Sequence, residues 1–354
     1  MMKKIKIAIV GAGNISNFHI KGYLQNPNVE LYALCDINEK TLMEQGRKYG
    51  IERLYTDEGK MLAELPEIDA VSVCTWNSAH APATIAALDA GKHVLCEKPM
   101  AMNADEAKAM IEASKRNNKK LMVGFVRRYG NDAEVARDFI DAGSLGDVYY
   151  AKAVYLRRNG CPGGWFGDKS RSGGGPLIDL GVHVIDLVRY LMGRPAPVSA
   201  YGATFSGMGK RKNLKDRVDY DVRGHGAAPM DVEDMATALV RFDNGAVLSV
   251  EASFNLHIGE GENKIEMYGT KGGVQFTPEF RLNTEVNDYL ANVTINKSTK
   301  TTIDELFQRE IDCYINSIIE DKDVSAIAED GCTLMKILDA IYESAATGKE
   351  AVIK

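Results

Sequence analysis

The sequence lacks the features that mark membrane-spanning, disulfide-bonded and nucleic-acid-binding proteins. No apolar run reaches the roughly eighteen residues of a membrane span or forms a signal peptide, since the run at Ile5–Val10 stops at Gly11. The six cysteines form no CxxC pair, so we expect no metal site, no disulfide framework and a reducing, cytoplasmic setting. The 43 basic residues against 49 acidic ones leave a net charge of −6, which provides no basic field for nucleic acid or an anionic membrane. The expected partner is therefore a small molecule.

The composition is that of a globular protein of two domains. The chain has 354 residues, of which 45% are hydrophobic and 26% charged, and at roughly 150 residues per domain this length favours two domains. The one strongly charged stretch, 207–229, has no row of aromatic side chains beside its basic residues. It therefore predicts a solvated or interface loop and not a nucleic-acid patch.

The first third of the chain alternates short apolar runs with helical stretches. The runs lack a polar alternation, which is typical of strands buried on both faces of a parallel sheet. The repetition predicts an α/β fold with a doubly wound parallel sheet. The expected strands are Ile5–Val10, Val29–Cys35, Ala70–Cys74, His93–Cys96 and Lys120–Val126, and the expected helices are Ser16–Gln25, Glu39–Tyr49, Ala81–Ala90 and Ala104–Asn117.

The turn after the first strand has the sequence GAGNIS, from Gly11 to Ser16. A first glycine permits the tight turn, and a second lets backbone N–H groups approach a pyrophosphate at the N-terminus of the next helix. Ser16 replaces the third glycine of the strict dinucleotide fingerprint, although a small residue still permits close helix packing. The turn predicts cofactor contacts from Gly11, Gly13, Asn14 and Ile15.

Asp36 ends the second predicted strand, 25 residues after Gly11. A carboxylate near this spacing accepts hydrogen bonds from the adenosine ribose hydroxyls of a dinucleotide. Neither Ile37 nor Asn38 offers a cation for a 2′-phosphate, so NAD is favoured over NADP. The alternative is that Asp36 only caps the helix that begins near Asn38.

The segment after Leu177 predicts a buried helix with a titratable stripe. Between Leu177 and Val188 the residues that are neither apolar nor glycine are Asp179, His183 and Asp186, spaced i, i+4 and i+7 so that a regular helix places them on one side. Such a stripe is costly in a core unless its groups are paired or functional. His183 is the candidate general base, because histidine titrates near neutral pH. The alternative is a core histidine whose ring is held by a carboxylate.

Residues 74–100, CTWNSAHAPATIAALDAGKHVLCEKPM, resemble the Gfo/Idh/MocA family of NAD(P)-dependent oxidoreductases. The shared marks are Asn77 and His80 after the third strand and the AGKHV…EKP sequence that ends in Glu97, Lys98 and Pro99. Trp76 stands where the family more often has proline. The likeness continues through GFVRRY at 124–129, GGGPLIDLGVHVIDL at 173–187 and IEMYGTKGG at 265–273.

The resemblance implies how the chain is divided into domains. It implies a Rossmann domain at 1–125 and an α/β domain with an open, mostly antiparallel sheet at 126–354, whose last helix packs back on the first domain. Such second domains often mediate dimers or tetramers, so a homodimer or homotetramer is expected.

The resemblance also implies the roles of single residues. Lys98 would polarise the reacting oxygen, Asp179 and His183 would be catalytic, and Asp186 would orient the ring or tie down the helix. Arg127 would line the substrate pocket, whereas Arg128 is expected to be solvated. The full set of expected cofactor contacts is Gly11, Gly13, Asn14, Ile15, Asp36, Thr75, Trp76, Asn77, His80, Glu97 and Lys98, and that of substrate contacts is Lys98, Arg127, Tyr155, Arg157, Trp165, Asp179 and His183.

Three functional hypotheses follow. The first is an NAD-dependent dehydrogenase that oxidises a secondary hydroxyl of a cyclic polyol, sugar or glycoside. The second is an enzyme that keeps its NAD bound, oxidises a glycoside transiently at the 3-position, cleaves a bond and reduces the ring again. The third is a non-catalytic NAD-sensing protein, against which the presence of Lys98, Asp179 and His183 argues.

Overall fold

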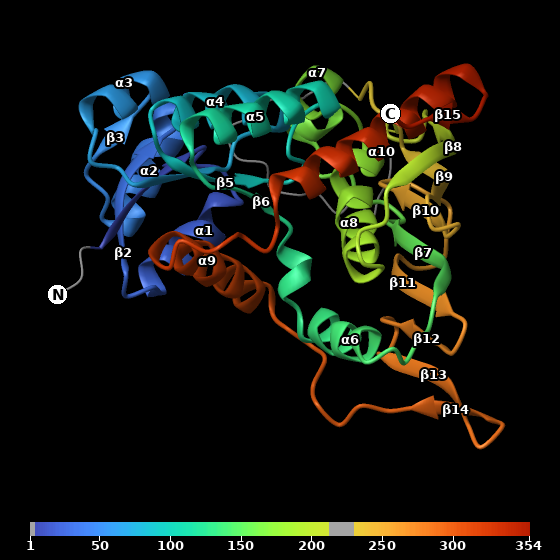
Figure 1. Ribbon diagram of the computed structural model, residues 1–354. Coiled ribbons are helices and arrows are strands. Elements are labelled where there is room, and N and C mark those ends of the chain that lie inside the picture. The colour runs from blue at the N-terminus through green and yellow to red at the C-terminus, as the bar shows by residue number, and fades with distance from the viewer. Residues whose placement is uncertain (1–3, 212–229) are drawn as a thin grey trace.

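The computed structural model describes residues 4–211 and 230–354, which form two sheets joined by helices (Figure 1). The charged stretch at 207–229 falls mostly on 212–229, outside the described residues. Within the described ranges, no helix combines the length and the apolar composition that a membrane span requires.

The first sheet is six-stranded and parallel, in the order β3-β2-β1-β4-β5-β6. This is the predicted doubly wound arrangement, with the addition of the two-residue strand β3. Its strands are β1 Ile5–Val10, β2 Val29–Cys35, β3 Leu54–Tyr55, β4 Ala70–Val73, β5 His93–Glu97 and β6 Leu121–Gly124.

Three helices of the first sheet begin at side chains that satisfy free backbone N–H groups. Asn38 Oδ1 accepts a hydrogen bond from Thr41 N at 3.1 Å, and Asn103 Oδ1 accepts one from Glu106 N at 2.9 Å. Gly50, with φ of 70°, ends α2 in the left-handed conformation. The helices of the first sheet are α1 Ser16–Gln25, α2 Glu39–Tyr49, α3 Glu58–Glu64, α4 His80–Asp89, which follows the short helix η1 Asn77–Ala79, and α5 Ala104–Asn117.

The second sheet has nine strands in the order β14-β13-β12-β11-β7-β10-β9-β8-β15. Strands β7 and β10 are parallel and the other pairs are antiparallel, so the sheet is mixed and mostly antiparallel, as expected. Its strands are β7 Val148–Leu156, β8 Pro197–Phe205, β9 Met235–Phe242, β10 Val247–Ser253, β11 Glu262–Gly269, β12 Gly272–Gln275, β13 Arg281–Val286, β14 Tyr289–Val293 and β15 Ala351–Val352.

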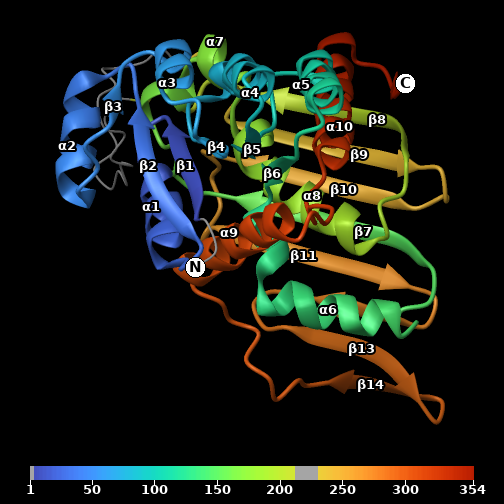
Figure 2. The same ribbon diagram turned by 60° about the vertical axis from the view of Figure 1, so that its left-hand side comes forward.

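Helices after β6 connect the two sheets and cover one face of the second (Figure 2). Helix α9 packs against α1, where the rings of Phe18 and Phe307 stack at 4.8 Å, and α10 packs against α5 and β8. The helices are η2 Val126–Tyr129, α6 Asn131–Asp141, η3 Gly164–Gly167, α7 Lys169–Ser172, the π-helix η4 Leu177–Gly181, α8 Val182–Leu191, α9 Ile303–Ile319 and α10 Ala328–Thr347.

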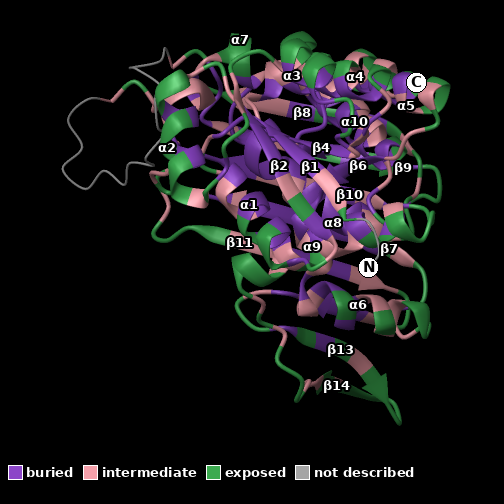
Figure 3. Cartoon of the chain, turned by 90° about the vertical axis from the view of Figure 1, so that its left-hand side faces the viewer, coloured by how far each residue is buried: buried purple, intermediate pink, exposed green. Residues whose placement is uncertain are grey.

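Burial differs between the centre of the molecule and the second sheet. The strands of the first sheet are largely buried, whereas strand β14 is largely exposed (Figure 3). Strands β7, β8 and β9 also expose large apolar side chains, at Tyr149, Tyr201, Phe205 and Leu239. Exposed apolar surface of this kind is typical of a face that another protein surface covers.

Candidate active site

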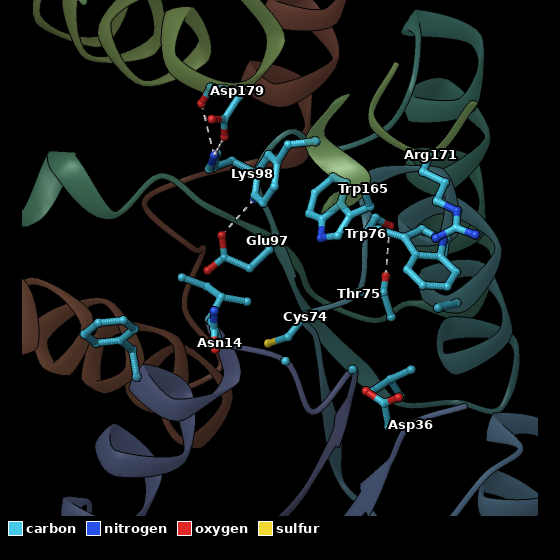
Figure 4. Close-up of a pocket in the computed structure, with 18 of the residues that line it drawn as sticks. Asn14, Asp36, Cys74, Thr75, Trp76, Glu97, Lys98, Trp165, Arg171 and Asp179 are labelled. Atoms are coloured by element: carbon cyan, nitrogen blue, oxygen red, sulfur yellow. Dashed lines mark hydrogen bonds and ion pairs between the residues drawn. The ribbon is translucent and has the colours of Figure 1, made fainter. Parts of the chain in front are cut away.

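A cavity of about 1210 Å³ opens where the carboxyl ends of the parallel strands meet the second sheet. It exceeds the roughly 300–1,000 Å³ of common small-ligand pockets, so it has room for a dinucleotide and a further molecule. Figure 4 shows Lys98 and Asp179 at one end and Asp36 at the other, with Asn14 facing Thr75 and Trp76 between them. The expected residues that line the cavity are Gly11, Gly13, Asn14, Ile15, Asp36, Thr75, Trp76, Tyr155, Arg157, Trp165, Glu97, Lys98, Asp179 and His183.

The two glycines of the first turn serve different purposes. Gly11 has φ of +94°, and a Cβ on it would lie 2.6 Å from the carbonyl carbon of Cys74, so only glycine fits there. A Cβ on Gly13 would meet no atom within 4 Å, which leaves its backbone open to a ligand in the cavity. Ser16 is buried and its hydroxyl donates to the carbonyl oxygen of Gly13 at 2.7 Å, so the residue in place of the third glycine closes the turn.

Asp36 holds the acidic position at the end of β2. Its Oδ2 accepts a hydrogen bond from Ala12 N at 2.6 Å, and its Oδ1 accepts one from Asn38 N at 2.7 Å. The carboxylate therefore joins the glycine turn to the start of α2. The side chain that caps α2 is that of Asn38, so Asp36 is not the cap residue of this helix.

Lys98 and Asp179 join the two halves of the site. Lys98 follows β5, and its Nζ lies 2.9 Å from Asp179 Oδ1 and 3.0 Å from the Asp179 carbonyl oxygen, with both side chains largely buried. The start of η4 is anchored by Glu233, whose carboxylate accepts hydrogen bonds from Gly175 N at 2.8 Å and Leu177 N at 3.2 Å. The aspartate is thereby held in front of the ammonium.

The segment that carries the titratable residues is not a regular helix. Residues 177–181 form a π-turn, and α8 begins at Val182. Asp179 and His183 line the cavity, but Asp186 does not: its oxygens lie 2.6 and 2.9 Å from the guanidinium of Arg128. The predicted single stripe is therefore wrong for Asp186, because its carboxylate pairs with the buried guanidinium of Arg128 and does not face the cavity. The expectation that Asp186 ties down the helix agrees with this ion pair.

Arg128 was expected to be solvated, and this is wrong. The residue is only 7% exposed and pairs with Asp186 and, at 3.0 Å, with Asp330 of α10. A buried charge requires such partners, and they come from helices far away in the sequence. Arg128 thus connects the crossover between the domains to α8 and α10.

His183 is neutral in this site. Burial lowers the pKa of its imidazole well below 6.5, and the nearby cations Lys98, Arg127 and Arg157 lower it further. A neutral ring keeps a lone pair free to accept a proton. The same cations favour a negative charge on an oxygen placed between them and the ring.

Three expected site residues do not line the cavity. Asn77 donates from Nδ2 to the carbonyl oxygen of Ser172 at 2.7 Å, across the two halves of the molecule. The ring nitrogens of His80 lie 2.7 Å from the Pro99 oxygen and 3.1 Å from the Thr75 oxygen, so this histidine connects the loop after β4 to the loop after β5 that carries Lys98. Arg127 donates to Asn263 Oδ1 of β11 at 3.0 Å.

Glu97 is backed by a buried polar cluster. His19 Nε2 lies 2.8 Å from Glu97 Oε1, and His19 Nδ1 lies 3.3 Å from Ser72 Oγ. Glu310 of α9 is fully buried nearby, and burial, with the adjacent Glu97, raises its pKa well above 4.5. The cluster fixes the carboxylate of Glu97 at the wall of the cavity.

Sequence reasoning missed several walls of the cavity. Helix α9 contributes Ile303 and Phe307, and the short helix η3 contributes Phe166, whose ring stacks on Trp165 at 3.9 Å. Arg171 of α7 also lines the cavity. The aromatic residues next to glycines at 163–167 could have indicated a wall of the cavity. The contribution of α9 depends on long-range packing, and no local sequence pattern indicates it.

The site has the parts of a dinucleotide-dependent oxidoreductase. These are a glycine turn that leads into a helix, an acidic residue after β2, and a lysine after β5 that faces an aspartate and a neutral histidine. Comparison with known families agrees with this class. Residues 5–125 match the model of the oxidoreductase family with an NAD-binding Rossmann fold, and residues 134–275 match the GFO/IDH/MocA C-terminal domain. The chain belongs to the GFO/IDH/MocA family of oxidoreductases, as the sequence motifs indicated.

Its relatives include several named sugar and polyol dehydrogenases. The chain is 33% identical to D-glucoside 3-dehydrogenase of Escherichia coli (strain K12), over 97% of this chain and 96% of that protein. It is 30% identical to myo-inositol 2-dehydrogenase of Thermotoga maritima, over 76% and 74%. A solved structure of levoglucosan dehydrogenase in complex with NADH superposes with a TM-score of 0.87 at 27% identity, covering 99% of this chain and 100% of that one.

Proposed function

We propose that the protein oxidises a secondary hydroxyl of a sugar, glycoside or cyclic polyol with NAD. The observation that carries this proposal is the Lys98 ammonium, held 2.9 Å from Asp179 beside the neutral His183, in a cavity that begins at Asp36. The names of the relatives support the substrate class, since they act on a glucoside, on levoglucosan and on inositols.

The residues present fit the cofactor. The open backbone at Gly13 offers the close approach that a pyrophosphate needs, and Asp36 stands where the adenosine ribose would lie. Asn14, Ile15, Thr75, Trp76 and Glu97 would complete its binding site. When bound there, NAD supplies the acceptor for the hydride that leaves the substrate carbon.

The chain's own residues account for the proton. The Lys98 ammonium would bind the reacting hydroxyl oxygen and lower the pKa of that alcohol, while Asp179 keeps the ammonium in place. His183 would take the hydroxyl proton on its free ring nitrogen. The products would be a ketone, the reduced cofactor and a protonated imidazole, which then returns its proton to water.

Substrate and cofactor selectivity would come from opposite ends of the cavity. Aromatic Trp165 with Tyr155 and Arg157 suits the face and hydroxyls of a sugar ring, and Arg127 would support them from behind. The carboxylate of Asp36 favours NAD, because a 2′-phosphate beside it would be repelled.

We also propose the wider setting of the enzyme. The exposed apolar side chains of β8 and β9, which are Tyr201, Phe205 and Leu239, support a homodimer or homotetramer built on that face of the second sheet. The cofactor domain would span 1–125 and the substrate domain 126–354, and the cysteine pattern supports the cytoplasm.

The test is a substrate panel. Purified protein is incubated with NAD and with inositols, free sugars and glycosides, and both NADH absorbance and product mass are followed. NADH formation with one substrate group supports the dehydrogenase. Glycoside breakdown without NADH would instead support the cycle in which NAD stays bound, a reading that the relatives' names as dehydrogenases do not favour.

A further inference from the structure

Two residues from different domains meet at the side of the cavity. The guanidinium carbon of Arg171, on α7, lies 5.0 Å from the ring centroid of Trp76, which follows β4 (Figure 4). Both residues line the cavity. A guanidinium at this distance over an indole face makes a favourable cation–π contact.

The contact is part of a built interface. The side chain of Asn77 donates to the Ser172 oxygen at 2.7 Å in a buried hydrogen bond, which joins η1 to the end of α7. Asp168 caps α7 and its Oδ2 lies 3.4 Å from Arg171 Nε, which orients the guanidinium toward Trp76. The position of Arg171 is therefore set by its own helix and by the opposite domain together.

The guanidinium of Arg171 lies on the wall of the cavity opposite the glycine turn (Figure 4). Three Lys or Arg side chains line the cavity within residues 4–211 and 230–354, and two of them, Lys98 and Arg157, act on His183. The third, Arg171, lies beside Trp76 and Thr75, opposite Asn14 of the glycine turn (Figure 4). A pyrophosphate at that turn carries two negative charges, which a nearby cation attracts.

We propose that Trp76 and Arg171 form an interdomain clamp that slows the release of a bound nicotinamide dinucleotide, with Arg171 presenting its charge to the pyrophosphate. The inference rests on the proposed NAD-dependent function. Release would require Arg171 to leave the indole face and the two domains to part at this contact. The clamp thus sets how long the cofactor stays between turnovers.

The rate of NADH release tests the clamp. The full chain is loaded with NADH, mixed rapidly with excess NAD, and followed by NADH fluorescence. Arg171→Ala and Trp76→Leu are each expected to speed release about five- to tenfold, whereas Trp76→Phe, which keeps an aromatic face, stays near the wild-type rate. The effect of the double variant Arg171→Ala and Trp76→Leu should be smaller than the product of the two single effects, because both substitutions remove the contact between these side chains.

A matched control and a salt series separate this role from a general structural one. Arg53 lies over the ring of Tyr32 at 4.0 Å but does not line the cavity, so Arg53→Ala removes a similar contact and should leave release unchanged. Added salt should speed release from the wild type and from Arg171→Lys, which keeps the charge, but little from Arg171→Ala.

Two results overturn the clamp: wild-type release rates in both Arg171→Ala and Trp76→Leu, or effects that multiply in the double variant. A wild-type chain that binds no NADH would instead count against the proposed function itself.

Discussion

The Lys98 ammonium lies 2.9 Å from the Asp179 carboxylate and 3.0 Å from the Asp179 carbonyl oxygen. A side chain at the carboxyl end of β5 is therefore bound at two points to the π-turn of the second domain. The contact does two things. It brings the ammonium next to His183, and it makes the reactive geometry depend on the relation between the domains.

Lys98→Met should abolish most turnover while leaving NAD binding largely intact. Methionine keeps the length of the side chain but removes the charge that would stabilise the developing alkoxide, and loss of one such group costs about 10²- to 10³-fold in kcat. The measurement is steady-state oxidation of the best substrate together with an NADH titration. A fully active variant would refute the role given to Lys98.

Asp36→Ala should weaken NAD binding and reduce discrimination against NADP. The hydrogen bonds proposed between Asp36 and the ribose would be charge-assisted, so the affinity for NAD should fall by about 10- to 100-fold when they are lost. Asp36→Asn is the control, because it keeps an oxygen for Ala12 N or Asn38 N but removes the charge. Equal NAD and NADP affinities in all three proteins would remove Asp36 from cofactor selection.

The lowered pKa of His183 predicts that the acid limb of the pH profile of kcat/KM lies below pH 6.5. Burial and the surrounding cations hold the folded-state pKa well below that value, so the ring is already neutral at pH 7 and loses activity only when a lower pH protonates it. His183→Ala should lower kcat by about 10²- to 10⁴-fold and remove the limb. An unaltered pH–rate profile in this variant would point to another base.

The lowered pKa of His183 also makes the free energy of unfolding depend on pH. As pH falls through about 6.5, an unfolded chain binds a proton at this position that the folded chain does not, so the free energy of unfolding decreases. Burial likewise lowers the pKa of His93 to about 4, which adds to the loss over the same range. Denaturant unfolding between pH 7 and pH 5 measures the slope, and His93→Gln should reduce it.

Gly11→Ala and Gly13→Ala should fail in different ways. At Gly11 the added Cβ meets the Cys74 backbone at 2.6 Å in a left-handed conformation, which costs at least about 1–2 kcal/mol of folding free energy. At Gly13 the space is open, so the fold should persist while the methyl group obstructs the cofactor. Thermal unfolding and NADH titration of both variants separate the effects, and a destabilised Gly13→Ala with normal binding would contradict the account.

Local patterns predicted the fold well. Helices such as Ser16–Gln25 and Ala104–Asn117 and strands such as Val29–Cys35 lie where the hydrophobic pattern predicted them. The two-residue β3 was missed, because so short a strand has no period to detect. The strand expected to run to Val126 ends at Gly124, and the chain then turns into η2, so Arg127 and Arg128 do not alternate across a strand.

The site was predicted in part, and the shortfall has a physical cause. Motif residues such as Asp36 and Lys98 follow directly from position at strand ends, so sequence reasoning located them. The π-turn at Asp179, the burial of Arg128 and the cation–π contact of Arg171 arise from packing between distant segments. No local pattern encodes them.

The most direct test of the central claim follows the hydride itself. Levoglucosan, a methyl glucoside and myo-inositol, each carrying deuterium on its ring carbons, are incubated with the protein and NAD, and the reduced cofactor and products are analysed by mass. If Lys98 and His183 support hydride transfer as proposed, one of these substrates yields a ketone and one deuterium on the reduced cofactor for each ketone formed, and Lys98→Met yields neither. Reduced cofactor without deuterium, or a ketone formed at full rate by Lys98→Met, would contradict this mechanism.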